Sequence, residues 1–158
     1  MNTMKPNHAI FILLLAVMPM NAFAAPGDLD TSFDGDGLLV YDYSSGDDGA
    51  AVGLTTANKI ILMGYYDQLL VARFNNDGTL DTAFGANGES CLDPGYYPTI
   101  YGGLVQPDDK PLLVGEDTEN TRDAGIYRVR ADDGYFDTAG FNTNAGHATY
   151  DFSNFDAF

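Results

Sequence analysis

The acidic residues 30–35 have the residue types and spacing of a calcium-binding loop. Their sequence, DTSFDG, places Asp, Ser and Asp at loop positions 1, 3 and 5 and Gly at position 6, as in an EF-hand loop, which also needs an acidic ligand at position 12. Position 12 is Tyr41, and Asp42 comes one residue late. The related residues 81–86, DTAFGA, lack the ligands at positions 3 and 5. The pattern therefore favours hydrogen bonding within a turn over a calcium site.

Other side chains that could react or bind a metal are few. Cys91 is the only cysteine, so an exported chain has no intramolecular disulfide. Its neighbours Glu89 and Asp93 are acidic and do not favour a reactive thiolate; we expect Cys91 to be a small side chain on one face of a strand. His147 has no partner at zinc-ligand spacing, and no Gly-x-Ser-x-Gly motif accompanies it. We therefore predict no catalytic residue, no metal site and no cofactor, and place His147 at the exposed start of a strand.

Carboxylates and tyrosines leave two possibilities open. With 23 acidic residues, close carboxylate pairs of the kind that cleave glycosidic bonds must occur somewhere, but no pair stands out. Tyrosine pairs at residues 65–66 and 96–97 fall in predicted loops. They either form a binding rim or cover the edges of sheets with their hydroxyl groups in water, and the second role is favoured.

The first 24 residues have the features of a secretory signal peptide. Lys5 provides a positive start, residues 9–18 (AIFILLLAVM) form an apolar core, and small residues precede a predicted cleavage after Ala24. Ten apolar residues in a helix span only about 15 Å, half of the ~30 Å hydrocarbon core, which argues against a membrane anchor. We therefore expect a periplasmic or extracellular mature chain, residues 25–158, without an integral membrane span.

The charge of the chain restricts its partners. The formal net charge is −16, and removal of the leader takes away Lys5 and no acid. Such a surface argues against binding to nucleic acid and to anionic membranes. It favours solubility and loose association with cations, and a solvated acidic coat without any partner is the favoured interpretation.

The chain repeats itself at a fixed distance. LDTSFDGDG at residues 29–37 (motif 1) returns 51 residues later as LDTAFGANG at residues 80–88 (motif 2), and more loosely as FDTAGFNTNAG at residues 136–146 (motif 3). LTTANKIILMG at residues 54–64 likewise returns 51 residues later as VQPDDKPLLVG at residues 105–115. An internal period of this length is typical of a propeller or solenoid.

Each repeat unit reads as a set of short strands. In the first unit they are predicted at residues 38–43, 50–55, 59–64 and 69–75, and turn sequences such as Asn-Asp-Gly at residues 76–78 separate strands. No segment of the mature chain keeps a helical apolar period over three turns. About four strands per unit of 51 to 56 residues match a propeller blade. We place the units at approximately residues 29–79, 80–135 and, in part, 136–158.

The repeated motif is then expected to join blades. It should follow the last strand of one blade and precede the first strand of the next. Phe33 and Phe84 would fill the space between neighbouring sheets, with Leu29 and Leu80 covering the same junction. The Asp and Thr residues beside them would bond to backbone groups.

These motifs resemble the delta-60 repeat, a bacterial repeat of exported proteins associated with β-propeller architecture. The resemblance is carried by residues 26–37 (PGDLDTSFDGDG), 72–88 (ARFNNDGTLDTAFGANG) and 105–115, and it covers nearly all of residues 26–158. It implies the fold and implies no catalytic residue. The chain departs from the pattern at residues 55–59, where TTANK replaces a Pro-Asp-Gly-Lys turn, and at Phe141, where the aromatic residue is displaced.

The sequence therefore predicts an all-β, incomplete propeller: about two four-stranded blades and the first strand of a third, at residues 148–155. Propellers close with roughly four to eight blades. One bare blade face forfeits on the order of 10 kcal/mol of apolar burial, comparable to the stability of a whole domain. We expect the face to be covered by self-association, or by further propeller blades if the chain is a piece of a longer propeller.

For function, the sequence favours an exported, non-enzymatic repeat module for binding or scaffolding, with an unknown ligand. Partners would meet its loops or its unpaired strand edges. Two alternatives stay open. One is a fragment of a propeller hydrolase or lyase with carboxylates at the central channel, which rests on fold analogy alone. The other is a truncated fragment without a function.

Overall fold

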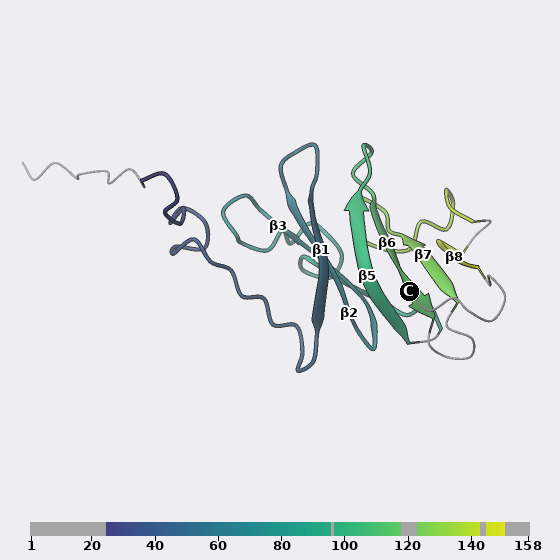
Figure 1. Cartoon of the computed structure of the whole chain (residues 1–158). Coiled ribbons are helices and arrows are strands. Elements are labelled where there is room, and N and C mark those ends of the chain that lie inside the picture. Colours follow the sequence, from purple (N-terminus) through teal and green to yellow (C-terminus); the bar gives the residue numbers. More distant parts are fainter. Residues whose placement is uncertain (1–24, 96, 118–122, 143–144, 151–158) are drawn as a thin grey trace, which may run out of the picture.

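A computed structural model describes residues 25–95, 97–117, 123–142 and 145–150, and all of their regular secondary structure is β-strand. The strands form two four-stranded antiparallel sheets, each with its strands in sequence order (Figure 1). The first sheet consists of β1 (Asp48–Leu54), β2 (Ile60–Tyr66), β3 (Gln68–Phe74) and β4 (Glu89–Leu92). The second sheet consists of β5 (Pro98–Val105), β6 (Pro111–Asp117), β7 (Ala124–Arg128) and β8 (His147–Tyr150).

The predicted fold class is confirmed: the protein is all-β, with two four-stranded sheets in the manner of an incomplete propeller. Within the described residues, no helix is long and apolar enough to cross a membrane. The predicted signal peptide, residues 1–24, lies outside the described part of the chain.

The assignment of strands to blades needs a correction. Motif 2 lies inside the first sheet, between β3 and β4, and does not join one blade to the next. Similarly, the strand expected to open a third blade is β8, which pairs with β7 as the fourth strand of the second sheet; residues 151–155 of that prediction are outside the described residues. The physical reason is that a strand after the motif pairs with the nearest free edge, that of the third strand before it.

A second correction concerns residues 38–43. They were predicted to be the first strand of the first blade, but they form no strand, and β1 begins only at Asp48. By the 51-residue offset, residues 38–41 correspond to β4, a fourth strand. Among the described residues, no third strand precedes them to offer an edge for pairing.

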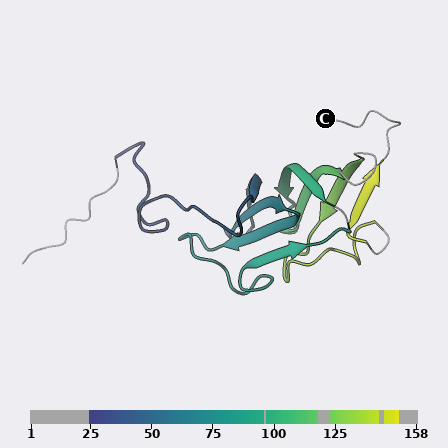
Figure 2. The same cartoon turned by 90° about the horizontal axis from the view of Figure 1, so that it is seen from below.

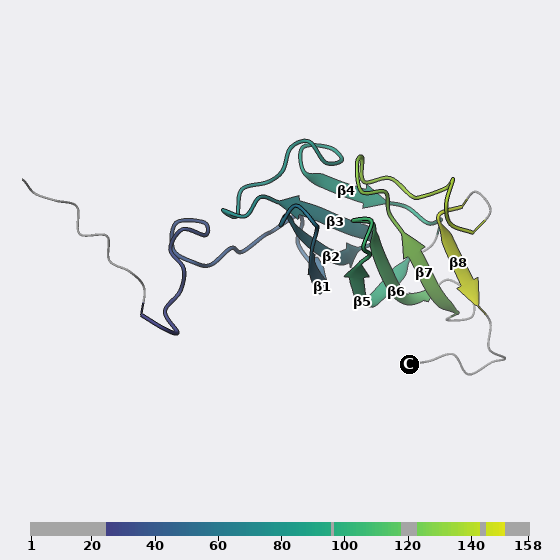
Figure 3. The same ribbon diagram turned by 90° about the horizontal axis from the view of Figure 1, so that it is seen from above.

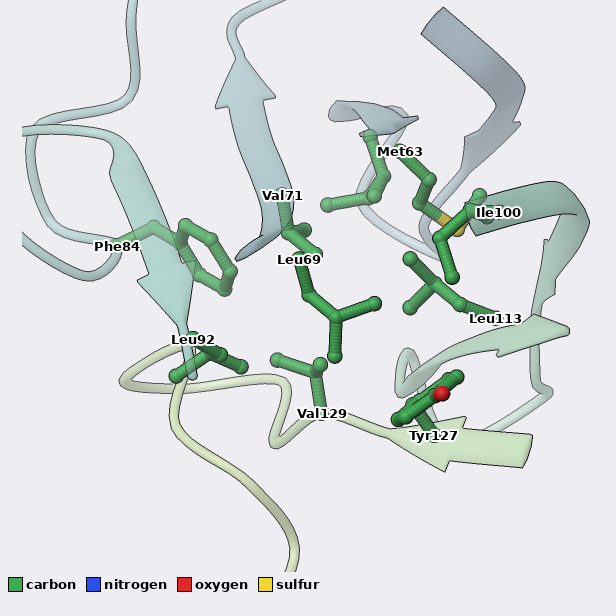
Figure 4. Close-up of a cluster of buried hydrophobic side chains, with 10 residues drawn as sticks. Met63, Leu69, Val71, Phe84, Leu92, Ile100, Leu113, Tyr127 and Val129 are labelled. Carbon is green, nitrogen blue, oxygen red and sulfur yellow. The ribbon is translucent and has the colours of Figure 1, made fainter. Parts of the chain in front are cut away.

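The apolar core lies between the two sheets. The first strands, β1 and β5, run side by side, and β4 and β8 lie farthest from them within their own sheets (Figures 1 and 3). A cluster of ten buried side chains from both sheets fills the space between them (Figure 4). Its members are Ile61, Met63, Leu69, Val71, Phe84, Leu92, Ile100, Leu113, Tyr127 and Val129.

The apolar run of β2 is buried on the face that meets the second sheet and only half-buried on the other. Ile61 and Met63 are buried in the cluster, and Leu62 is half-buried on the opposite face. The sheets approach closely: a Cβ atom at Gly103 of β5 would lie 2.9 Å from the sulfur of Met63. Glycine in this strand therefore allows the two sheets to pack.

Candidate functional site

The three copies of the motif have the same local fold. In motif 1 the amide of Phe33 donates to the carbonyl of Asp30 at 2.9 Å, and Gly37 donates to Phe33 at 2.7 Å. In motif 2 the equivalent bonds, from Phe84 to Asp81 and from Gly88 to Phe84, are 3.0 and 2.7 Å. Motif 3, whose residues 143–144 lie outside the described part, makes the equivalent two bonds with one more residue between Asp137 and Phe141 and one more between Phe141 and Gly146. The motif is thus a compact turn that presents one Asp and one Phe.

Phe84 of motif 2 fills the space between the sheets, as predicted. Its side chain is fully buried, and its ring lies against the turn of the second sheet that contains Gly134, where a Cβ atom would be 2.9 Å from Cζ of the ring. The hydroxyl of Ser90 in β4 donates to the carbonyl of Gly134 at 2.5 Å. The guanidinium of Arg73 donates to the carbonyl of Ala131 at 2.7 Å. Motif 2 and β4 therefore join the first sheet to this turn.

Each sheet also holds a Lys–Asp–Arg cluster centred on its motif. In the first sheet, a carboxylate oxygen of Asp81 lies 2.9 Å from Nε of Arg73 and 3.3 Å from Nζ of Lys59. In the second sheet, Asp137 is 2.8 Å from a guanidinium nitrogen and 3.2 Å from an ammonium nitrogen. The cations of this second cluster are Arg128 and Lys110.

The arginine of each cluster also lies over the motif phenylalanine. The guanidinium carbon of Arg73 is 4.7 Å from the ring centroid of Phe84, and that of Arg128 is 4.9 Å from the centroid of Phe141. Both distances suit a cation–π contact. The cluster thus ties the motif, which leads into the fourth strand, to the third strand and to the residue before the second strand of the same sheet.

Burial and the two cations act in opposite directions on the carboxyl groups of these clusters. Burial disfavours the charged form of Asp137, but Lys110 and Arg128 outweigh it, and the pKa of Asp137 lies below its ordinary value. The pKa of Asp81 is likewise lowered, by backbone and cation contacts that exceed the cost of burial. A lowered carboxyl pKa stabilises the fold above the unfolded-state pKa and loses that effect as the pH falls through the folded-state value.

Motif 1 is placed like motif 2 but lies at the other side of the first sheet. Phe33 packs against the turn that contains Gly78, where a Cβ atom would lie 3.4 Å from its ring. Phe33 is only half-buried and contacts the first sheet alone. The prediction that it fills a space between two sheets is therefore not met within the described residues. The carboxylate of Asp30 is exposed and accepts hydrogen bonds from Ser32, at 2.7 Å from the hydroxyl, which lower its pKa.

Residues 38–43 continue from motif 1 along the face of the first sheet that is turned away from the second (Figures 1 and 2). The ring of Tyr41 meets that of Phe74 edge-on at 5.2 Å, and its hydroxyl donates to Glu89. Burial, and then Glu89, raise the pKa of Tyr41. Leu38 and Val40 are 58% and 90% exposed. The segment therefore contacts the first sheet through Tyr41 and leaves the side chains of Leu38 and Val40 in water.

The candidate calcium loop is a hydrogen-bonded turn in the structure. Asp30 bonds to Ser32, and Asp36 accepts from the amide of Leu38. Within the described residues there is no group of three or more His, Cys, Asp or Glu side chains that could hold a metal ion. The local bonds of Asp30 agree with the turn chemistry that the sequence favours.

Cys91 and His147 both lie in strands, as predicted. Cys91 is exposed in β4, and its sulfur lies 3.0 Å from the side-chain oxygen of Gln68. His147 begins β8 but is half-buried, with its ring stacked 6.2 Å from that of Tyr127. Its expected exposure is therefore wrong, because the imidazole packs on a core side chain.

The tyrosine pairs contribute to a hollow at one end of the first sheet. The hollow has a volume of about 560 Å³. It is lined by Tyr43, Tyr66, Asp67, Gln68, Cys91, Asp93, Gly95 and Tyr97. Tyr96 lies outside the described residues. The sequence indicated Tyr66 and Tyr97 as a possible rim, and the structure adds Tyr43 to them.

The enzyme alternative requires carboxyl groups with raised pKa at a common pocket, because a general acid must hold its proton near neutral pH. Asp67 and Asp93 share the hollow just described. The pKa shifts of Asp81 and Asp137, which lie outside this hollow, are downward. The hydrolase or lyase hypothesis stays a prediction.

Sequence reasoning missed the Lys–Asp–Arg clusters, although the repeat contained the signal. Lys59 and Lys110 are 51 residues apart, and an arginine lies at or next to the end of the third strand in both units. The Asp of the motif follows each arginine by eight or nine residues. Residues that recur in step with one another are candidates for mutual contact, and here they touch.

Comparison with known families supports the propeller assignment. The family model described as a domain of unknown function (DUF5122), β-propeller, matches residues 58–84. The matched residues contain β2, β3 and the first part of motif 2, up to Phe84. No match was found among curated proteins or among solved structures.

Proposed function

We propose that the chain is an exported, non-enzymatic repeat module of the delta-60 type that serves in binding or scaffolding, and that its copies associate through the open faces of their sheets. The leader-like residues 1–24 support export. The acidic composition supports a soluble protein that binds neither nucleic acid nor anionic membranes.

The observation that carries this proposal is the open face of the second sheet, the face turned away from the first sheet. Val114 in β6 and Leu104 in β5 are 41% and 51% exposed there, and Leu112 and Ile126 are half-buried. An apolar face of this kind marks an interaction surface. Covering one such side chain contributes about 1.5–3 kcal/mol.

The repeat shows what this face is built to contact. By the 51-residue offset, Leu112 and Val114 correspond to Ile61 and Met63 of the first sheet. Those two side chains are 1% and 0% exposed because they pack on the second sheet. The open face of the second sheet therefore corresponds to a surface that already binds a neighbouring blade within the chain.

The complementary surface is present on the same chain. The open face of the first sheet, turned away from the second, carries Val52, 68% exposed, and the half-buried Leu62. Leu62 corresponds by the same offset to Leu113, which is fully buried under the first sheet. One copy thus offers both halves of the contact, and association is head-to-tail, closing into a ring or continuing as a chain of copies.

Two substitutions test this arrangement from its two sides. We expect Val114→Asp and Val52→Asp each to make the chain monomeric in light scattering, because each places a charge in one half of the apolar contact. A mixture of the two variants should form heterodimers and nothing larger. In that mixture, the intact second sheet of the Val52→Asp chain meets the intact first sheet of the Val114→Asp chain.

The matched control is Tyr97→Asp, which adds the same charge at a side chain 64% exposed, in the segment between β4 and β5. It should associate as the unaltered chain does. Association that survives both Val→Asp substitutions would overturn the proposal. So would a mixture that stays monomeric while each variant keeps its β-sheet circular dichroism.

A further inference from the structure

The described residues contain three motifs but only two sheets. Each sheet takes one motif and the fourth strand that follows it: motif 2 with β4, and motif 3 with β8. Motif 1 has the same fold as motif 2, but it and residues 38–41, which form no strand, belong to neither sheet. They correspond to the outer part of a blade whose three inner strands are absent from the described residues.

The position of motif 1 shows where those inner strands belong. Phe33 meets the Gly78 turn of the first sheet as Phe84 meets the Gly134 turn of the second. The amide of Asp34 also donates to the carbonyl of Asp77 in that turn, at 2.8 Å. Motif 1 therefore lies where the motif of a blade stacked on the open face of the first sheet would lie.

Residues 38–41 repeat the same relation. Tyr41 corresponds by the 51-residue offset to Leu92 of β4, and it contacts Phe74 at the end of β3. Leu92 lies in the core cluster with Val129, which follows Arg128 of β7 just as Phe74 follows Arg73 of β3 (Figure 4). Beside Tyr41, a hollow of about 100 Å³ on the open face of the first sheet is lined by Leu62 and Leu70.

Motif 1 lacks the contacts that hold the other two motifs. Asp81 and Asp137 each bind a lysine and an arginine, whereas no salt bridge reaches Asp30 from the described residues. The rings of Phe84 and Phe141 each lie under an arginine. Phe33 has no such contact within the same part of the chain. By analogy with motifs 2 and 3, Asp30 and Phe33 would contact one Lys and one Arg of a neighbouring sheet.

We propose that motif 1 and residues 38–41 of one copy complete the second sheet of another copy, where they replace that copy's residues 136–150. The inference rests on the proposed head-to-tail association and names how the junction between copies is closed. The neighbour's β5, β6 and β7 then lie on the open face of the first sheet, with motif 1 already in place beside them.

The second sheet has the chemistry that motif 1 lacks. It supplies Lys110 and Arg128, which bind Asp137 in the isolated chain and would bind Asp30 after exchange. It also brings the open face with Leu104 and Val114 onto the first sheet. The salt-bridge partners for Asp30 and the apolar face that would cover the first sheet therefore both belong to the second sheet of another copy.

The exchange replaces Asp137 and Phe141 in kind, whereas the strand residues 147–150 (HATY) give way to residues 38–41 (LLVY). An Asp is replaced by an Asp and a Phe by a Phe. Motif 1 keeps the three-residue Asp-to-Phe spacing of motif 2, whereas motif 3 has four. Exchange is favoured because the second sheet of one copy then stacks on the first sheet of the other and buries their open apolar faces, which stay exposed in the isolated chain.

The first test is the charge reversal Asp30→Lys in the chain from Ala25. We expect self-association, measured by sedimentation over a dilution series, to weaken by about tenfold or more, because the new ammonium faces Lys110 and Arg128 in the junction. The melting temperature of the dissociated chain should not change, because Asp30 is exposed. The matched control is Asp28→Lys, an equal charge change at an exposed residue two positions earlier, which should leave association as it is.

A cross-linking experiment identifies the exchanged segment directly. In a Cys91→Ser background, chains with Asp30→Cys are mixed with chains with Lys110→Cys and treated with a short bismaleimide. We expect a linked heterodimer whose joined peptides contain positions 30 and 110. The control mixture uses Asp81→Cys in place of Asp30→Cys and should give no such product, because Asp81 is held in its own sheet.

The outcomes separate this inference from the proposed function. If Asp30→Lys associates as well as Asp28→Lys and no 30–110 link forms, while Val114→Asp is monomeric, the faces dock without exchange and the inference is overturned. If Val114→Asp still associates, the proposed function itself fails. Weakened association together with the 30–110 link supports the exchange.

Discussion

Phe84→Ala is expected to destabilise the protein by about 3–5 kcal/mol, the range for removing a fully buried aromatic ring. Phe84 is 0% exposed, lies under Arg73 and touches the Gly134 turn. Its removal leaves a cavity at the junction of the two sheets, where the chain around it is held by hydrogen bonds and cannot collapse freely. Urea unfolding followed by circular dichroism measures the loss.

The repeat provides matched controls for this substitution. Phe33 and Phe141 occupy the same position in motifs 1 and 3 and are half-buried. Replacing either with alanine should cost about 1 kcal/mol in the dissociated chain, because less apolar surface is lost from the core. Equal losses at all three positions would contradict the assignment of Phe84 to the junction.

Asp137→Ala is expected to destabilise the protein by about 2–3 kcal/mol. Removing one partner of a buried ion pair costs about 3–5 kcal/mol, and the lower figure applies here because the side chains of Lys110 and Arg128 keep 29% and 16% of their exposure. The carboxylate itself is 5% exposed. The substitution leaves the charges of Lys110 and Arg128 without their shared carboxylate, and it removes the contact that holds the start of motif 3.

The pH dependence of this variant provides a second measurement. The pKa of Asp137 is lower in the folded chain than its ordinary 3.8, so its stabilising effect is complete above that value and is lost as the pH falls below it. The unaltered chain should therefore lose stability more steeply below about pH 4 than Asp137→Ala does. Asp30→Ala, at the same motif position but exposed, should depart less from the unaltered chain, because only hydrogen bonds from Ser32 lower the pKa of Asp30. Parallel curves for the unaltered chain and Asp137→Ala would contradict the role of the cluster.

The fold could be predicted from the sequence because its main signals are local and repeated. Motifs 1 and 2 stand 51 residues apart, and the apolar run of β2 alternates between the two faces of its sheet. The turn glycines Gly78 and Gly134 adopt positive φ, at 89° and 74°. These features depend on neighbours in the chain, and they indicate strands and turns whatever the strands pair with.

The assignment of strands to sheets could not be predicted in the same way. Residues 38–43 alternate like a strand, but a strand forms only where a neighbouring edge pairs with it, and that edge is missing here. The repeat period also looks the same wherever counting begins, so motif 2 can be read as preceding a blade or as lying within one. Hydrogen bonding of β4 to β3 decides between the two.

Of the candidate site, the sequence predicted the position of Phe84 and missed the Lys–Asp–Arg clusters. Phe84 was placed correctly at a junction, whereas the contact of Asp81 with Lys59 and Arg73 depends on three segments that meet only after folding. The difference between Asp30 and Asp81 was also hidden, because both stand in the same motif. Asp81 is held by cations on or next to the inner strands of its own sheet, whereas Asp30 has no such strands beside it among the described residues and is exposed.

The central claim is that two blades with open faces are completed by copies of the same chain. Light scattering of the unaltered chain from Ala25, over a concentration series, tests it most directly. We expect a weight-average mass of at least twice the chain mass at high concentration, falling towards the chain mass on dilution. A chain that stays monomeric at the highest concentration and still melts in one cooperative transition would contradict it.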